Sequence, residues 1–451
     1  MQHSRKWLSE VAQKRVIEVQ DRIAQLEPNL LQNEIEILAK ENHAIHDKNS
    51  INLNPATNVL NPRAEKILST GLSSRASLGH PGDKYEVGLD AIEQIEVITG
   101  DLACKLFESK YVEFRVGSGA LANLYAFMAT CKPGDKIIAP PASIGGHITH
   151  HKPGAAGLYG LDITEAPIDE ENYTVDVDKL RKLAHEIKPK LITIGGSLNL
   201  FPHPIREIRD VADEVGAWLL FDAAHQCGLI AGKVWPQPLS EGAHLMTFST
   251  YKSLGGPAGG LIITNEEKLA EKIDAIAYPG LTANYDAAKT AALGITLQDW
   301  NIVGEAYAKM MVETSIALAK ELDKKSLHIY AKEKGFTTSH QFAIVANELG
   351  GGQKASKKLA LSGLLACGIN VPGPAVENDT NAIRIGTPEV VRMGMKKDDM
   401  PLLADLIFKG LTTDTPDLVQ AEVIKLRKKR SEEHTSELQS PDHLVCRLLL
   451  E

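Results

Sequence analysis

The stretch TFSTYKSLGGPAGG, residues Thr247 to Gly260, places one lysine between an apolar run and a glycine-rich turn. Lys252 is open to three interpretations: a charge that grips phosphate, a reactive amine, or a surface lysine whose stem lies along apolar surface. A Walker-type phosphate loop is excluded, because in that motif the lysine follows the glycines and here it precedes them. A lysine at the end of a buried strand suits an amine that loses its proton and forms an imine.

Short apolar runs separated by helical patterns surround this stretch. Strands are predicted at VEFRV, KIIAP, KLITIGG, AWLLFDAA, HLMTFST and GGLIITN. Helical patterns such as IREIRDVADEVG and turn signals such as KPGDK lie between them, which predicts a mostly parallel sheet with helices on both faces. A long amphipathic helix is predicted over residues 303–323. A smaller α/β lobe follows, with strands at HQFAIVA and AIRIG and helices at KKLALSGLLA and DMPLLADLIFKGL.

The chain divides into four predicted parts. Residues 1–50 are expected to form an N-terminal helical arm, residues 51–300 a large domain, and residues 301–429 a small C-terminal domain. Residues 430–451 begin RSEEHTSELQS, which resembles the translation of a sequencing-library adapter. This tail is interpreted as an artefact and carries no argument about fold or function.

The composition excludes several classes of protein. The 451 residues are 43% hydrophobic and 24% charged, with a formal net charge of -9, so no basic field attracts nucleic acid. No apolar run reaches about eighteen residues and the N-terminus lacks an apolar signal region, so we expect a cytoplasmic protein without a membrane partner. The five cysteines form no CxxC pair and are expected to be buried thiols in a reducing compartment.

Polar residues follow three of the predicted strands, and ligands of such sheets gather beyond the carboxyl ends of the strands. These residues are Ser118 and Gly119 after VEFRV, Asp222 and His225 after AWLLF, and Lys252 after HLMTF. A carboxylate at the end of an apolar strand is costly unless a cation meets it, and a protonated heteroaromatic nitrogen is one such partner for Asp222.

Two competing motifs are weaker. GSGALA, residues 117–122, fits a dinucleotide fingerprint, but more than a hundred residues precede it and the next strand ends in prolines instead of an acid. What remains is a helix start that can hold one phosphate, or simply a serine N-cap beside a close-packed glycine. HITHH spaces His147 and His151 for a metal, but Pro153 breaks any helix and no carboxylate lies nearby in sequence, so no metal site is predicted.

Five segments together resemble successive blocks of serine hydroxymethyltransferase, a fold-type-I pyridoxal phosphate enzyme, in the same order and with similar spacing. The resemblance covers about residues 50 to 410 and rests on GSGALAN, PGDKIIAPPASIGGHITHH, GAWLLFDAAHQCGLIAG, TFSTYKSLGGPAGG and AIRIGTPEVVRMG. It implies an α/β fold with a large sheet domain and a smaller C-terminal domain, pyridoxal 5′-phosphate as cofactor, an amino-acid substrate, and a homodimer with shared active sites.

The resemblance also implies roles for individual residues. Lys252 would form the imine, Asp222 would meet the pyridinium nitrogen, and His147 would stack on the ring. The implied catalytic residues are Lys252, Asp222, His147 and His225. The implied cofactor-binding residues are Ser118, Gly119, Ser197, Asp222, His225 and Lys252, and the implied substrate-binding residue is Arg384. Tyr85 and His80 of the substrate loop are further candidates for substrate binding. For Arg384 the expected partner is the substrate α-carboxylate, which suits a planar two-pronged donor.

The sequence departs from the family in the loop SRASLGHPGDKYEVG, residues 74–88. Leu78 stands where the family has a glutamate that transfers protons, and of the family's paired tyrosines only Tyr85 remains. Other departures are Ala76, His80, Ala56, Thr57, Tyr251 and Pro374, and YPGLTAN lacks its second glycine pair. His80, Tyr85 or Glu86 could replace the lost glutamate, because a general acid or base is still needed near Cβ.

The sequence therefore predicts an enzyme acting at the Cα–Cβ bond of a β-hydroxy-α-amino acid, without the usual use of tetrahydrofolate. Two alternatives stay open. The same scaffold hosts aminotransferases and β-eliminating lyases, and a non-catalytic pyridoxal phosphate-binding subunit would show the same loss of loop residues. The intact Lys252, Asp222 and Arg384 argue against the second alternative.

Overall fold

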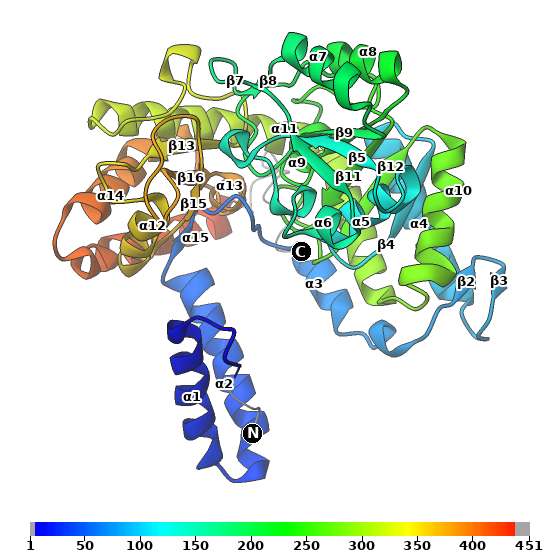
Figure 1. Cartoon of the computed structure of the whole chain (residues 1–451). Coiled ribbons are helices and arrows are strands. Elements are labelled where there is room, and N and C mark those ends of the chain that lie inside the picture. Colours follow the sequence, from blue (N-terminus) through cyan, green and yellow to red (C-terminus); the bar gives the residue numbers. More distant parts are fainter. Residues whose placement is uncertain (1–4, 438–451) are drawn as a thin grey trace.

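The structure, a computed structural model, describes residues 5–437 (Figure 1). Two lobes share the long helix α11, and a helical hairpin at the N-terminus projects away from both. The predicted adapter-derived tail spans residues 430–451, and its residues 438–451 lie outside the described residues.

A seven-stranded sheet forms the larger lobe. Its order is β4 (Tyr111–Val116), β12 (Gly260–Thr264), β11 (Leu245–Ser249), β10 (Trp218–Asp222), β9 (Leu191–Gly195), β5 (Lys136–Ala139) and β6 (Asp162–Glu165). All neighbours are parallel except that β12 runs antiparallel to β4 and β11. The predicted strands and mostly parallel sheet are confirmed. Strand β6 was not predicted, because it is a half-exposed edge strand with no apolar run.

Helices bury both faces of this sheet, which is why its strands read as continuous apolar runs. Along β11, Met246 and Phe248 point into the core that includes Leu293 and Leu297 of α11 (Ala287–Lys324). Leu245 points to the other face, where Tyr125 of α5 (Gly119–Thr130) packs beside α10 (Glu267–Ala275).

Helix α11 is longer than its amphipathic pattern predicts. It has 38 residues and begins at Ala287, sixteen residues before the predicted start at residue 303. Its first half packs against α3 (Pro62–Leu68) and α4 (Asp90–Phe107) as well as the sheet lobe, so apolar residues occupy most of its faces and the amphipathic period is lost. The side chain of Asp286 caps the helix by accepting from the amides of Ala288 and Lys289.

The smaller lobe has its own core around a three-stranded antiparallel sheet. Its elements are β13 (Gln341–Val345), β16 (Ala382–Gly386), β15 (Cys367–Ile369), α12 (Gly352–Leu361), α14 (Met400–Thr412) and α15 (Gln420–Glu437). Strand β1 (Ile51–Asn52) pairs with β14 (Leu364–Leu365), and Ile51 and Leu53 lie in this second core. The chain therefore enters the smaller lobe before it crosses to the large sheet.

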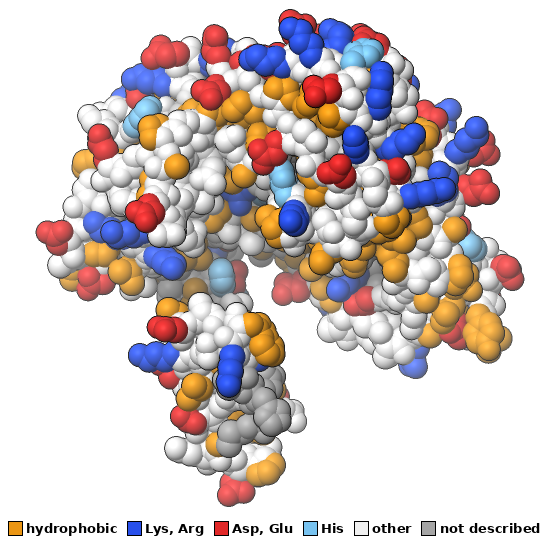
Figure 2. All heavy atoms as spheres, viewed as in Figure 1, with side chains coloured by type: hydrophobic (Ala, Val, Ile, Leu, Met, Phe, Trp, Pro, Cys, Tyr) orange, Lys and Arg blue, Asp and Glu red, His pale blue; other side chains and the backbone are white. Residues whose placement is uncertain are grey.

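Helices α1 (Glu10–Ala24) and α2 (Leu31–His43) form the N-terminal hairpin, and none of their residues is buried. Figure 2 shows acidic and basic side chains intermixed over the face in view, without a basic stripe. Within residues 5–437 no helix is long and apolar enough to cross a membrane.

Candidate active site

Lys252 lies in the turn that follows β11 and is 7% exposed. The turn is closed by two backbone hydrogen bonds, from the amide of Gly255 to the carbonyl of Lys252 at 2.9 Å and from Gly256 to Thr250 at 2.8 Å. Burial lowers the pKa of Lys252 to about 8; the charge of Arg384 adds to this shift and the charge of Asp222 opposes it. The amine is thus far closer to its neutral, nucleophilic form at neutral pH than an exposed lysine.

Asp222 ends β10 beside the start of that turn and is 2% exposed. Its Oδ2 accepts from Nδ2 of Asn123 at 3.0 Å and lies 2.9 Å from Nε2 of His150, while its Oδ1 accepts from the amide of Ala224 at 3.0 Å. Burial alone would raise the pKa of Asp222, but the hydrogen bond from His150, the charges of His150 and His147 and the amide of Ala224 together hold the pKa well below its usual range. The carboxylate is held as a buried anion.

The partners of Asp222 were missed in the sequence. His150 belongs to HITHH, where it was considered only as part of a metal motif while His147 was assigned to the cofactor ring. Asn123 follows the predicted phosphate turn. The predicted alternation of helices and strands could have identified Asn123 as a partner, because it brings α5 over the end of β10. Among residues 5–437 there is no group of three side chains suited to a metal ion.

Two predicted histidines lie in the same cluster. His225 places Nε2 at 3.1 Å from Nζ of Lys252, and its Nδ1 is buried without a protein partner. Burial lowers the pKa of His225 well below its ordinary value, and burial likewise lowers the pKa of His147 to about 4. The Nδ1 of His147 lies 2.8 Å from Oγ1 of Thr149, which fixes one side of the ring. Both imidazoles are therefore neutral at neutral pH.

Ser118 and Gly119 begin α5, as the motif predicts. The hydroxyl of Ser118 caps the helix by accepting from the amide of Leu121 at 3.2 Å. A Cβ on Gly119 would come within 2.1 Å of Oγ of Ser249, so only glycine lets this helix start approach the end of β11. The first amides of an α-helix have no acceptor within it, and together with the helix dipole such a helix start can hold one phosphate group.

Arg384 reaches this cluster from β16 of the smaller lobe, so the site lies between the lobes. Its Nη1 donates to the carbonyl of Ser197 at 2.5 Å and lies 3.3 Å from Nε2 of His225. Its Nη2 contacts Sγ of Cys367 at 3.2 Å, and Nε is buried without a partner. These contacts hold the guanidinium in place, and no carboxylate among residues 5–437 pairs with it. A guanidinium in this setting can pair with a carboxylate.

The segment that contains Ala56 and Thr57 lies beside the same cluster. Asn54 Oδ1 accepts from the amide of Ala56 at 3.0 Å and from Cys367 Sγ at 3.2 Å, next to Arg384. Asn58 Nδ2 donates to the carbonyl of Ser253, which follows Lys252, at 3.3 Å. The substituted positions Ala56 and Thr57 therefore lie between two residues whose side chains contact the surroundings of Lys252 and Arg384 in the same chain.

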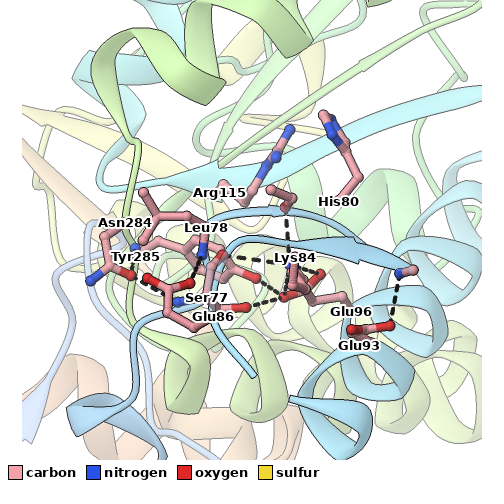
Figure 3. A network of polar contacts seen from close by, with 12 residues as sticks. Ser77, Leu78, His80, Lys84, Glu86, Glu93, Glu96, Arg115, Asn284 and Tyr285 are labelled. Carbon is pink, nitrogen blue, oxygen red and sulfur yellow. Dashed lines mark hydrogen bonds and ion pairs between the residues drawn. The ribbon is translucent and has the colours of Figure 1, made fainter. Parts of the chain in front are cut away.

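The loop with His80 and Tyr85 belongs to a different polar network, which Figure 3 shows around Lys84 and Glu96. His80, on β2 (Gly79–His80), places Nε2 at 3.0 Å from Asp274, and Tyr85 is 84% exposed. Within the described part of the chain no hydrogen bond or ion pair joins this loop to Lys252, Asp222 or Arg384. In one chain, the structure therefore brings the predicted cofactor residues together but leaves His80 and Tyr85 apart from them.

The sheet, the strand-end lysine and the buried carboxylate define a fold-type-I pyridoxal phosphate-dependent enzyme. The chain belongs to the serine hydroxymethyltransferase family, whose family model matches residues 30–407. The resemblance inferred from the five segments is thereby confirmed.

Individual relatives divide into two groups. The chain is 61% identical over 407 residues to an alpha-methylserine aldolase of Variovorax paradoxus, covering 90% of this chain and 92% of the relative. It is 52% identical over 437 residues to an alpha-methylserine aldolase of Ralstonia sp, covering 96% and 99%. A serine hydroxymethyltransferase of Saccharolobus islandicus is 36% identical over 405 residues, covering 89% and 93%. Similarity is thus greater to these two aldolases than to this hydroxymethyltransferase.

Proposed function

We propose that this chain binds pyridoxal 5′-phosphate through Lys252 and cleaves an α-methylserine-type substrate to alanine and formaldehyde without tetrahydrofolate. The names of the relatives that are 52% and 61% identical support this substrate. The observation that carries the folate-free part is Leu78: the cofactor cluster is complete, but an aliphatic side chain occupies the position of the family's proton-transferring glutamate.

The residues of the cluster fit the cofactor. Asp222 is a buried anion that suits a protonated ring nitrogen, and the start of α5 at Gly119 suits the phosphate. The face of His147 suits the ring, and the lowered pKa of Lys252 suits imine formation. The buried Nδ1 of His225 has no protein partner and is available to the substituents of the cofactor ring. Ser197 lies close to His225, because Nη1 of Arg384 contacts both the carbonyl of Ser197 and Nε2 of His225.

When bound, the cofactor accepts electrons from the substrate Cα, so that a bond at that carbon can break. Arg384 binds the substrate carboxylate and fixes which bond at Cα stands ready to break. Asp222 keeps its negative charge because His150 and Asn123 hold it, and this charge favours the protonated ring nitrogen. The amine of Lys252 would be placed to return a proton to Cα.

A homodimer completes the proposed site. His80 and Tyr85 make no contact with the Lys252 cluster of their own chain among the described residues, so a substrate-binding role requires a second copy. This assignment follows the shared sites expected from the family resemblance.

The test is incubation of purified holoenzyme with α-methylserine in the absence of tetrahydrofolate. We expect alanine and formaldehyde in equal amounts, and none of either with Lys252→Ala. Rapid formation of glycine and methylenetetrahydrofolate from serine and tetrahydrofolate, with α-methylserine inert, would overturn the proposal. With serine as substrate, a 2-oxo acid without free ammonia would favour the transaminase, and a 2-oxo acid together with ammonia would favour the lyase. No product with any β-hydroxy amino acid would favour the non-catalytic alternative.

A further inference from the structure

An aldol cleavage needs a base for the β-hydroxyl proton, and the Lys252 cluster does not offer a free carboxylate. Asp222 is the one carboxylate among the described residues of the cluster, and its oxygens already contact His150, Asn123 and the amide of Ala224. His225 faces Lys252 and Arg384. The Nδ1 atom of His147 faces Thr149. A free carboxylate base for the hydroxyl group therefore has to come from outside this cluster.

Glu86 brings a carboxylate to the backbone of Leu78. Its Oε2 accepts from the amide of Leu78 at 3.0 Å (Figure 3). The amide of Tyr85 donates to the carbonyl of Leu78 at 3.1 Å. The loop thus folds so that the side chain of residue 86 places its acid beside the main chain of residue 78. Glu86 is half-buried, and its other carboxylate oxygen accepts no hydrogen bond from residues 5–437.

The base of this loop is held firmly. Lys84 and Glu96 form an ion pair at 2.7 Å with both side chains 3% exposed, and the hydroxyls of Ser77 and Tyr285 also donate to Glu96. Such a buried network fixes the loop on α4 in one conformation. A group carried by the loop is therefore positioned by the large lobe of its own chain.

The tip of the loop is uncovered in the single chain. Tyr85 is 84% and Val87 is 96% exposed, and Figure 2 shows hydrophobic side chains on the surface where β2 and β3 (Asp83–Lys84) lie in Figure 1. A rigid loop that presents an aromatic and an aliphatic side chain to solvent is typical of a contact with another protein. A second copy of this chain is the occupant that would bring Glu86 to a Lys252 cluster.

We propose that Glu86 is the catalytic base for the β-hydroxyl group, acting in the active site of a second copy of this chain. This inference rests on the proposed aldolase function. Glu86 takes the hydroxyl proton, the Cβ–O bond becomes the double bond of formaldehyde, and the Cα–Cβ bond breaks with its electron pair left on the amino-acid fragment. One proton returned to Cα completes alanine, so atoms and charge balance.

The substitution that separates a chemical role from a structural one is Glu86→Gln. Glutamine retains an oxygen that accepts from the Leu78 amide, so the loop keeps its hydrogen bond but loses the base. We expect kcat for α-methylserine cleavage to fall about 100-fold or more, a typical loss for a general base. The matched control is Glu93→Gln, which alters a carboxylate that accepts from the amide of Gly82 at 2.7 Å in the same hairpin and should leave kcat unchanged.

Two readouts do not depend on cleavage. The visible absorption of bound cofactor and the exchange of the alanine α-proton with solvent need no base at the hydroxyl, so both should survive in Glu86→Gln. The double variant Leu78→Glu with Glu86→Gln returns a carboxylate to the loop and should recover part of the lost cleavage. Loss of cofactor absorption or of α-proton exchange together with cleavage would show a structural role and overturn the inference.

Subunit mixing tests the second copy directly. Glu86→Gln and Lys252→Ala chains are each impaired, but a hybrid dimer has one site with both wild-type groups. Half of randomly mixed dimers are hybrids, so mixing should restore about a quarter of the wild-type rate if Glu86 acts across the interface. No recovery, with hybrids detected by differential tagging, would overturn action in a second copy. An active wild type with an equally active Glu86→Gln overturns only this inference, whereas a wild type without aldolase activity overturns the proposed function as well.

Discussion

The Nζ atom of Lys252 lies 3.1 Å from Nε2 of His225, although the first residue comes from the large sheet's β11 turn and the second from the turn after β10. Arg384 contacts the same imidazole nitrogen from the smaller lobe at 3.3 Å. Two cationic side chains therefore converge on one neutral ring in a buried site. This convergence, together with burial, favours loss of the proton from Lys252.

The rate of cofactor loading should depend on pH through Lys252. Its pKa is lowered from 10.5 to about 8, and only the neutral amine attacks the cofactor aldehyde, so loading of apoprotein should accelerate as pH rises and level off above about 8. Stopped-flow recording of the visible cofactor band measures this rate. A midpoint near the ordinary 10.5 would contradict the lowered pKa, and Lys252→Ala should show no such pH-dependent phase.

Replacing His150 should make the apoprotein less resistant to acid. The folded-state pKa of Asp222 lies below its ordinary 3.8, so its charge contributes stability above about that pH, and this contribution is lost as pH falls. His150→Phe removes the hydrogen bond that lowers the pKa of Asp222, so acid unfolding followed by circular dichroism should shift to higher pH. His151→Phe is the control, because Nε2 of His151 faces the carbonyl of Pro140 instead. Equal unfolding curves for the two variants would count against this account.

The buried pair beneath the substrate loop should be important for stability. Lys84→Met leaves Glu96 buried without its cation, which should lower the free energy of unfolding by about 3–5 kcal/mol. Urea denaturation of the apoprotein measures this loss. Lys309→Met breaks the exposed pair with Glu305 and should change stability little. If the two variants unfold at the same urea concentration, the pair does not anchor the loop.

The sequence predicts the large sheet well because its central strands are covered on both faces and read as continuous apolar runs. Edge strand β6 was not predicted, because it is partly exposed and has no apolar run. The first half of α11 was not predicted, because it is buried on several faces and so lacks an amphipathic period. Strand-end residues such as Asp222 and Lys252 are predictable because parallel strands end at one edge.

The partners of these residues were not predictable from spacing. His150 meets Asp222 across 72 residues, and Arg384 meets Ser197 across 187, so each contact depends on packing between elements that sequence periodicity does not order. The carboxylate of Glu86 was one of three candidates in its loop, and the hydrogen bond to Leu78 singles it out. That choice requires the folded loop, because residues eight apart have no fixed relation in sequence.

The glycine at the start of α5 should be required for tight cofactor binding. In Gly119→Ala the new Cβ would lie 2.1 Å from Oγ of Ser249 and 3.3 Å from the carbonyl of Phe248, so the helix start must move away from β11 and misplace its amides. We expect the cofactor dissociation constant to rise about 10-fold or more, since one displaced charge-assisted hydrogen bond contributes about 1.5–3 kcal/mol. Equilibrium titration of apoprotein measures this change. Gly100→Ala in α4 is the matched control, because its Cβ would make only ordinary contacts at 3.6 and 3.7 Å and should leave cofactor affinity unchanged. Unchanged affinity in both variants would mean that the phosphate does not bind at this helix start.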